Sequence, residues 1–301
     1  MEAAGKLGAA ENLKTLRVRR AAARAAGGIL DLVMLMRPGD GGPPLFCAHP
    51  MVGLSWCYMA MIPHLSGTYP LYGLQARGLR RPEPLPASLP EMARDYTDQI
   101  RMTQPTGPYH LLGMSLGGNI AFAIAEELVR RGEQVGLLVI LDTNMTTLEG
   151  IEVEPWAVYN LVLAQFGYVP AVDRDEPNPE ARMLEVVRRQ PGLGLDEWPE
   201  QRLRALQRVI TNNIAIAHTY RPGRVSCPLL FFSAARNPPS YAEKLSNWES
   251  FVDGPVESVE LDCDHRQMLL PEPMALLAPA LSERMARATA AIKSASIKSM
   301  A

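Results

Sequence analysis

The sequence predicts an α/β fold: a mostly parallel, doubly wound sheet with a helical subdomain inserted into it. Short apolar strands alternate with amphipathic helices along most of the 301 residues, a pattern typical of parallel sheets. The strand predicted at 135–141 is apolar except for one glycine, as expected where helices cover both faces of a sheet. Between Asp142 and Leu229 helical patterns follow one another, over an interval far too long for a simple crossover.

The first half of the chain supplies most of the predicted strands. Strands are predicted at 30–36, 45–49, 70–74, 109–113 and 135–141, and helices at 55–65, 89–103 and 116–131. Pro90 stands in the first turn of the second helix, where its missing N–H is not needed. In the third helix, Ile120, Ile124 and Leu128 recur every four residues, and a glycine follows the last turn.

The second half predicts a group of helices and then two strands. Helices are predicted at 155–166, 179–190 and 199–218, and strands at 229–233 and 256–261. The pattern is clearest in the last helix, where Leu203, Leu206 and Ile210 fall on one face. Because these helices follow the carboxyl end of a sheet strand, we expect them to form a lid over a site at that edge.

These patterns divide the chain into a core, an insertion and two terminal segments. We assign 29–145 and 223–284 to the α/β core and 146–222 to a helical lid. Residues 1–28 are rich in alanine with an excess of basic side chains, and we interpret them as a linker or tail. Residues 285–301 are rich in Ala, Ser and Lys without a clear apolar face, and we interpret them as a C-terminal tail.

Composition and charge exclude several classes of protein. Thirty Lys and Arg nearly balance 32 Asp and Glu, for a formal net charge of −2, which excludes a strongly basic nucleic-acid-binding chain and an acidic disordered one. No apolar run approaches the roughly 18 residues of a membrane-spanning helix, and no signal-peptide core is visible. Four scattered cysteines fit reduced thiols, and no cluster has zinc-ligand spacing. We therefore expect a cytoplasmic protein without a metal site and without nucleic-acid or membrane partners.

The clearest chemical signal is a G-x-S-x-G motif, GMSLG at 113–117, between a predicted strand and a predicted helix. A sharp strand-to-helix turn lifts the hydroxyl of Ser115 clear of the backbone, and the helix N-terminus offers free N–H groups and a positive dipole end. Gly113 and Gly117 are needed because Cβ atoms would block the close approach of the backbone there. We therefore predict that Ser115 is a nucleophile; the alternative is a plain glycine-rich turn.

A serine nucleophile requires a base, and the base requires an orienting carboxylate. Ligands bind beyond the carboxyl ends of the strands in open parallel sheets, so both groups are expected directly after strands. Asp142 ends the strand that follows the elbow helix, and His265 lies in the loop after the last strand. The resulting order of serine, aspartate and histidine along the chain is that of α/β-hydrolases.

Other residues compete for these two roles. Four further histidines lie within or at the ends of predicted elements and are weaker candidates for the base: His49, His64, His110 and His218. Of these, His49 ends a strand and is placed to line the site, but it precedes the nucleophile. For the acid, Asp262 and Asp264 are alternatives to Asp142, although side chains so near His265 in sequence point apart and reach it poorly.

Stabilisation of a developing oxyanion requires two N–H donors. The residue after the nucleophile supplies one of them, the amide of Leu116. The second is expected from the loop after the strand 45–49, where we select Met51 within the sequence HPMVG. The alternative interpretation of this loop is a tight turn formed by its proline and glycine.

Five segments, in this order, carry a resemblance to a known family: PLFCAHPMVG, YPLYGLQARGL, PYHLLGMSLGGNIAFAIAEELVRRG, LLVILDT and DCDHRQML. Together they resemble the type I thioesterase domain of nonribosomal peptide and polyketide synthetases, over roughly residues 30–280. The resemblance implies an α/β-hydrolase fold whose acid follows the strand after the elbow helix, as Asp142 does. It also implies a helical lid after that acid, matching 146–222, and a second oxyanion donor after the proline of the early loop, matching Met51.

This resemblance implies a terminal thioesterase. A carrier protein would deliver a peptidyl or acyl chain as a phosphopantetheine thioester, and Ser115 would take it as an ester. Water or an internal nucleophile would then release it as an acid or a macrocycle. The phosphopantetheine arm belongs to the carrier, so no cofactor of the chain's own is implied. The lid suits a bulky peptide or depsipeptide; a synthetase of the valinomycin type, which would oligomerise its chain before cyclisation, is one such case.

Three other functions are alternatives. A free-standing editing (type II) thioesterase would share the triad and hydrolyse misloaded acyl groups, although the long predicted lid and HPMVG in place of an HAGG-type loop favour a terminal domain. A small-molecule esterase or lipase would turn over simple esters without a carrier. A silent binding module on the same fold would require a broken triad, and none of Ser115, Asp142 and His265 is missing.

Overall fold

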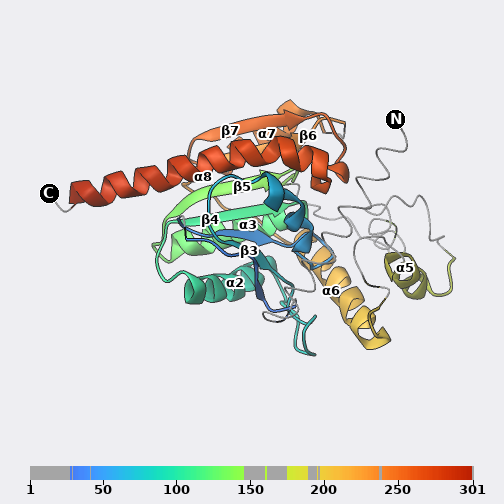
Figure 1. Ribbon diagram of the computed structural model, residues 1–301. Helices are drawn as coiled ribbons and strands as arrows, with labels where there is room; N and C mark the ends of the chain where they lie inside the picture. Colours follow the sequence, from blue (N-terminus) through green and yellow to red (C-terminus); the bar gives the residue numbers. More distant parts are fainter. Residues whose placement is uncertain are drawn as a thin grey trace.

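A seven-stranded sheet forms the centre of the computed structural model, which describes residues 28, 30–40, 42–145, 160, 175–188, 195, 197–236 and 239–299. Its strands are β1 (Val33–Arg37), β2 (Leu45–Ala48), β3 (Leu71–Leu74), β4 (Tyr109–Met114), β5 (Val135–Leu141), β6 (Leu229–Ala234) and β7 (Val256–Leu261). Their order in the sheet is β1-β3-β2-β4-β5-β6-β7, and every neighbouring pair is parallel except β1 with β3 (Figure 1). The mostly parallel sheet predicted from the sequence is confirmed.

Helices cover both faces of this sheet. They are η1 (Trp56–His64), α2 (Leu89–Thr103), α3 (Leu116–Arg130), α5 (Pro179–Arg188), α6 (Glu200–His218), α7 (Tyr241–Glu249), η2 (Gln267–Leu269) and α8 (Pro271–Ser299). α2, α3 and Trp248 of α7 pack on one face, and η1 and α8 pack on the other (Figure 1). Successive residues of one strand therefore serve opposite faces: Leu138 packs toward α3 and Val139 toward α8.

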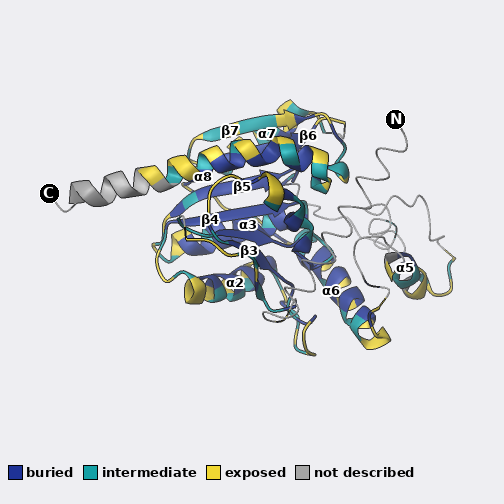
Figure 2. Cartoon of the chain, viewed as in Figure 1, coloured by how far each residue is buried: buried dark blue, intermediate teal, exposed yellow. Residues whose placement is uncertain are grey.

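Helix α6 packs into the fold through its apolar face. Its apolar face, which includes Leu203, Leu206 and Ile210, is buried in a third cluster together with residues of α5 and η1. Figure 2 shows α6 buried on the side that faces the core, while the outward side of α8 is exposed. The helices predicted at 179–190 and 199–218 correspond to α5 and α6, whereas the helix predicted at 155–166 lies outside the described residues.

Three elements differ from the sequence prediction. The helix predicted at 55–65 is the 3₁₀ helix η1, which contains Pro63, a residue without the N–H that α-helical bonding requires. No helix is predicted for α7, although Ser240 and Glu243 form a capping box at its start. Residues 285–299 of the segment assigned to a C-terminal tail are helical and continue α8, whose first half packs against the sheet and whose second half is rich in alanine, a strong helix former.

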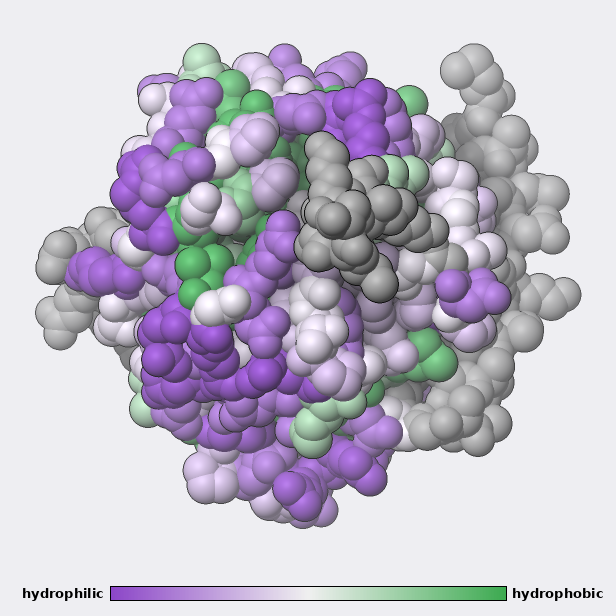
Figure 3. Space-filling view, turned by 90° about the vertical axis from the view of Figure 1, so that its left-hand side faces the viewer, coloured by the Kyte–Doolittle hydropathy of each residue, from purple (hydrophilic) through white to green (hydrophobic). Residues whose placement is uncertain are grey.

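The outer surface carries mainly polar groups on the face drawn in Figure 3. Hydrophilic side chains cover most of this face, and hydrophobic ones gather in smaller areas between them. Within the part of the chain that the structure describes, no helix is both long enough and apolar enough to cross a membrane.

His110 is a buried histidine that makes the stability of the fold depend on pH. It lies on β4 with a fully buried side chain, and burial lowers its pKa from 6.5 to about 4. A histidine with a lowered folded-state pKa stabilises the fold fully above its unfolded-state pKa, and this contribution is lost as the pH falls toward the folded-state value. We therefore expect protonation of His110 to lower the free energy of unfolding by about 2 kcal/mol when the pH falls from 7 to 4.5.

Between pH 7 and pH 4.5 the free energy of unfolding is expected to fall by about 2 kcal/mol less in His110→Leu than in the wild type. Urea unfolding of the wild type and of His110→Leu at both pH values measures this difference. The exposed His64 offers a matched control, because His64→Leu removes an imidazole that is not buried. An equal loss of stability in His110→Leu and the wild type would contradict the assignment.

Candidate active site

The turn between β4 and α3 consists of the half-buried Ser115. β4 ends at Met114 and α3 begins at Leu116, so a single residue makes the turn and adopts φ 55°. Thr143 Oγ1 donates a hydrogen bond of 2.8 Å to the Ser115 carbonyl, and Ser115 N–H donates one of 3.2 Å to Leu141 O. A non-glycine residue at positive φ is strained, and here the neighbouring strand holds it in place.

Glycines permit the close approach on both sides of this turn. A Cβ atom on Gly113 would overlap the carbonyl oxygen of Gly117, and one on Gly117 would lie 2.5 Å from the Ala48 carbonyl oxygen. Both contacts are far shorter than a van der Waals separation and involve backbone that cannot move aside. The backbone geometry therefore accepts only glycine at these two positions.

Asp142 and His265 lie in direct contact across the carboxyl edge of the sheet. Asp142 follows β5, and its Oδ2 lies 2.7 Å from His265 Nδ1. Because a carboxylate only accepts hydrogen bonds, Nδ1 must carry the proton, which leaves the basic lone pair of the neutral ring on Nε2. The carboxylate is buried, with 3% of its side chain exposed, whereas 21% of the His265 side chain is exposed.

Two further donors hold the other carboxylate oxygen of Asp142. Lys244 Nζ donates a hydrogen bond of 2.8 Å to Oδ1, and the Ala234 N–H donates one of 3.0 Å. Burial raises the pKa of Asp142, but the hydrogen bonds from His265, Lys244 and Ala234 outweigh it and hold the pKa of this carboxyl below its usual value. Asp142 is therefore ionised at neutral pH.

One cavity of about 250 Å³ brings the predicted site residues together. The lining includes the predicted nucleophile, acid, base and both oxyanion donors, with side chains of α6 and of the loop after β5: Met51, Ser115, Leu116, Asn119, Asp142, Thr143, Asn144, Ile214, Ala217, His218 and His265. Residues from five separate parts of the chain thus meet at the carboxyl edge of the sheet. This is the edge at which ligands bind in open α/β sheets.

Asp262, Asp264 and His49 are not among the residues that line this cavity. Asp262 pairs with Arg236 at the surface, and Asp264 accepts hydrogen bonds from the backbone N–H groups of Arg266 and Gln267. His49 is fully buried, and burial lowers its pKa to about 4, which suits a structural role.

Two further residues also belong to this region: His218, which the sequence offered only as a weaker candidate for the base, and Lys244, which it did not indicate. His218, which ends α6, lines the cavity, and Lys244 contacts Asp142 from α7. For Lys244 the one available signal is its spacing of a helical turn from Trp248, which places it on the buried face of α7.

The loop that carries Met51 is tied to α6. Gly53 N–H donates to Pro50 O at 2.9 Å, which closes a turn around Met51, and Asn213 Nδ2 donates to Met51 O at 2.9 Å. Asn213 lies on α6 and is 1% exposed, so this hydrogen bond is shielded from water. The position of the loop therefore depends on the position of α6.

Replacement of Asn213 by leucine is expected to slow acylation of Ser115 about tenfold. Complete loss of an oxyanion donor typically lowers the rate by a factor of about 10²–10³. A loosened loop is expected to misplace the Met51 amide only in part, so the expected decrease in rate is smaller. The rate constant of inactivation by a fluorophosphonate measures the effect. Asn212 is a matched control, because it lies next to Asn213 on α6 but donates to Pro86 O at 3.0 Å. Equal losses in Asn212→Leu and Asn213→Leu would mean that the effect comes from α6 docking in general.

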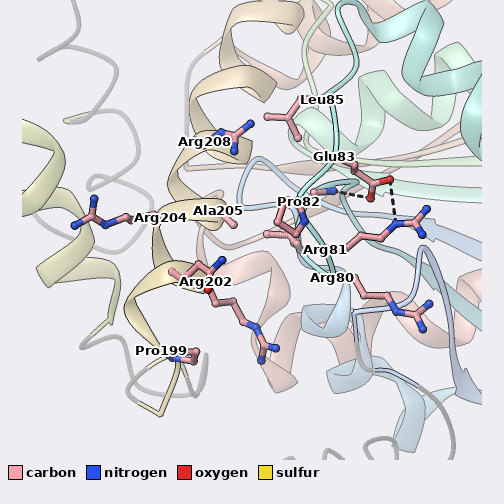
Figure 4. A pocket seen from close by; sticks show the side chains of 13 residues that line it. Arg80, Arg81, Pro82, Glu83, Leu85, Pro199, Arg202, Arg204, Ala205 and Arg208 are labelled. Carbon is pink, nitrogen blue, oxygen red and sulfur yellow. Dashed lines mark hydrogen bonds and ion pairs between the residues drawn. The ribbon is translucent and has the colours of Figure 1, made fainter.

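A larger cavity, of about 420 Å³, lies between residues 78–85 and the N-terminal half of α6 (Figure 4). Five arginines line it, but Arg80 pairs with Asp31, Arg81 with Glu83 and Arg204 with Glu200. In Figure 4 the side chains of Arg204 and Arg208 point in different directions, and the guanidinium groups do not converge on one point. The smaller cavity, which the predicted nucleophile, acid and base line, is therefore the candidate active site.

The sheet order, the strained serine between β4 and α3, and the Asp142–His265 contact at the carboxyl edge define the α/β-hydrolase class. Within this class, the chain belongs to the thioesterase domain family, whose model matches residues 43–278. The family acts on thioester bonds as hydrolases.

The curated relatives are much larger than this chain, which matches only a small part of each. The chain is 37% identical over 259 residues to a dimodular nonribosomal peptide synthase of Bacillus subtilis (strain 168), a match that covers 85% of this chain and 11% of that protein. It is 38% identical over 113 residues to enterobactin synthase component F of Escherichia coli (strain K12), covering 38% of this chain and 9% of that protein. The chain thus spans about a tenth of the length of these relatives.

Solved structures share the fold. A four-domain nonribosomal peptide synthetase bound to AMP and glycine matches with a TM-score of 0.74 and 24% identity, over 84% of this chain and 20% of that one. The thioesterase domain of Vlm2 bound with a dodecadepsipeptide matches with a TM-score of 0.67 and 23% identity, over 84% of this chain and 98% of that one. At this identity the likeness establishes the fold alone.

Proposed function

We propose that this chain is a terminal thioesterase in which Ser115 accepts a peptidyl or acyl chain from a carrier protein and then releases it. The observation that carries the proposal is the contact of 2.7 Å between His265 and a buried, ionised Asp142 beside the cavity that Ser115 lines. The family of the chain supplies the bond that is attacked, a thioester. The synthetases among its relatives favour a peptidyl chain on a carrier domain as the substrate.

Acylation begins with proton transfer. His265 Nε2 takes the proton of Ser115 Oγ as Oγ attacks the thioester carbonyl, and Asp142 stabilises the imidazolium that forms. The amides of Met51 and Leu116 bind the oxyanion of the tetrahedral intermediate. The C–S bond then breaks, and His265 returns its proton to the departing thiol of the phosphopantetheine arm. The product is an ester on Ser115. The arm enters as part of the substrate, and the chain needs no cofactor of its own for these steps.

The second nucleophile decides the product. Water activated by His265 yields a free acid, whereas a hydroxyl or amine of the bound chain yields a macrolactone or macrolactam. Both routes regenerate Ser115 and differ in how well water is kept out of the cavity. α6 contributes Ile214 and Ala217 to this cavity, so the proposed lid places apolar groups next to the ester. Such surroundings favour attack by the chain itself.

Intact-protein mass spectrometry with a panel of peptidyl N-acetylcysteamine thioesters tests the proposal. An adduct on Ser115 that resolves to an acid or a macrocycle is expected, with long peptidyl chains turned over faster than short acyl groups. Fastest hydrolysis of short acyl groups, without any cyclic product, would identify an editing enzyme instead. Efficient turnover of simple esters but not of thioesters would contradict both functions.

A further inference from the structure

A lysine that the mechanism above does not require contacts the acid of the proposed triad. Lys244 lies on α7 with 4% of its side chain exposed. Its Nζ donates to Asp142 Oδ1 at 2.8 Å and to the Ala234 carbonyl at 3.1 Å. α7 begins after β6 and reaches Asp142 across the end of that strand, so the contact joins two separate elements at the catalytic edge.

Stability alone does not account for this buried ion pair. Removing an ammonium and a carboxylate from water is costly, and well-packed apolar replacements of such pairs are often as stable or more stable. The Ala234 N–H already provides Oδ1 with a neutral donor at 3.0 Å. The ammonium therefore adds mainly a positive charge, next to the carboxylate that contacts His265.

The two oxygens of Asp142 have separate partners. Oδ1 is held by Lys244 and Ala234, whereas Oδ2 meets His265 Nδ1 at 2.7 Å. Donors on Oδ1 from two directions prevent rotation of the carboxylate, so Oδ2 remains aimed at the imidazole. The ammonium also offsets the negative charge of Asp142, which would otherwise stabilise the imidazolium more strongly. The charge of Lys244 thus opposes the charge that develops on the imidazole when it takes a proton.

We propose that Lys244 is a positioning residue that aims Asp142 at His265 and extends the activity of His265 as a base toward lower pH. This inference rests on the triad of the proposed function. It assigns Lys244 no contact with the substrate.

Other charged and titratable groups lie in the loop of His265, interact with that loop or line the same cavity, and they set the background for this effect. They come from the loop of His265 itself, from α6 and from the end of β6: Cys263, Asp264, Arg266, Asp262, His218 and Arg236. Among these, Arg236 is an exposed cation near the same loop that pairs with Asp262 at 2.8 Å, and it lies eight positions before Lys244. It therefore serves as the matched control for removal of a positive charge.

The experiment measures the rate constant of inactivation by a fluorophosphonate as a function of pH. This reaction requires the Ser115 hydroxyl and a neutral His265, forms the Oγ–P bond and releases fluoride, so it does not depend on the natural substrate. Lys244→Gln retains a donor for Asp142 but removes the charge. In this variant the acid limb of the pH profile, where the rate constant falls with decreasing pH, is expected to move to higher pH by roughly one unit. Lys244→Met, which also removes the donor, is expected to lower the plateau rate at least about tenfold as well.

The controls separate positioning from folding. A rate constant refers only to active molecules, so a smaller folded fraction does not change it. Arg236→Gln is expected to move the acid limb by less than about 0.2 pH unit, because its exposed charge is screened. Lys244→Arg keeps the charge, so the acid limb of its pH profile is expected to lie at the same pH as that of the wild type. An acid limb that does not move in Lys244→Gln, or that moves to lower pH, overturns the inference.

Failure of the proposed function gives a different result. A wild-type protein that labels at Ser115 but leaves peptidyl thioesters intact would overturn the proposed substrate and leave the role of Lys244 standing. A wild-type protein that does not label at Ser115 would overturn both.

Discussion

Replacement of Ser115 by alanine is expected to abolish covalent adduct formation, both with fluorophosphonates and with peptidyl thioesters. The expected loss of turnover is about six orders of magnitude, because the covalent route is lost and only the oxyanion donors and substrate binding remain to assist attack by water. The fold is expected to persist, since the hydroxyl of Ser115 is not needed for the hydrogen bonds that its backbone makes to Leu141 and Thr143. Alanine also removes little packing from a half-buried position.

Mass spectrometry of the labelled protein measures this effect directly. The matched control is Ser66→Ala, which removes the hydroxyl of an exposed serine that lies far from Ser115 in the sequence. This variant is expected to be labelled like the wild type. Circular dichroism of Ser115→Ala verifies the fold. A label that persists in a folded Ser115→Ala protein would show that another residue is the nucleophile.

Replacement of Asp142 by asparagine is expected to lower the acylation rate by about four orders of magnitude at neutral pH. The carboxamide can present an N–H to His265 Nδ1, which favours the wrong tautomer and removes the negative charge that stabilises the imidazolium. It also leaves the buried ammonium of Lys244 without its carboxylate, so a loss of stability of about 3 kcal/mol is expected as well.

Single-turnover acylation, normalised to folded protein, separates these two effects. Asp264→Asn is the matched control, because Asp264 is adjacent to His265 in sequence but accepts its hydrogen bonds from the Arg266 and Gln267 N–H groups. It is expected to acylate within about threefold of the wild type, as is usual for a residue outside the reacting groups. A large loss in Asp264→Asn with little in Asp142→Asn would identify Asp264 as the acid.

Much of the fold follows from local pattern. The strands β4 and β5 are predicted within one residue of their ends, because they are apolar along their length and bounded by turns. η1 and the second half of α8 are harder to predict. The type of η1 depends on Pro63, and the length of α8 depends on a helix nucleated by packing against the sheet. In both segments, local helix propensity alone does not determine the type or the length of the helix.

The sequence by itself determined the elbow, since strand, glycines, Ser115 and helix are contiguous and their geometry depends on neighbours in the chain. It also indicated Asp142 and His265 as groups at strand ends. Only the tertiary structure decided that these two meet, that Lys244 faces the same carboxylate and that Asn213 holds the Met51 loop. These contacts join residues 123, 102 and 162 positions apart. Contacts over such separations depend on how α6 and α7 pack against the sheet edge, and the periodicity of a helix determines which face it buries but not which residues that face will meet.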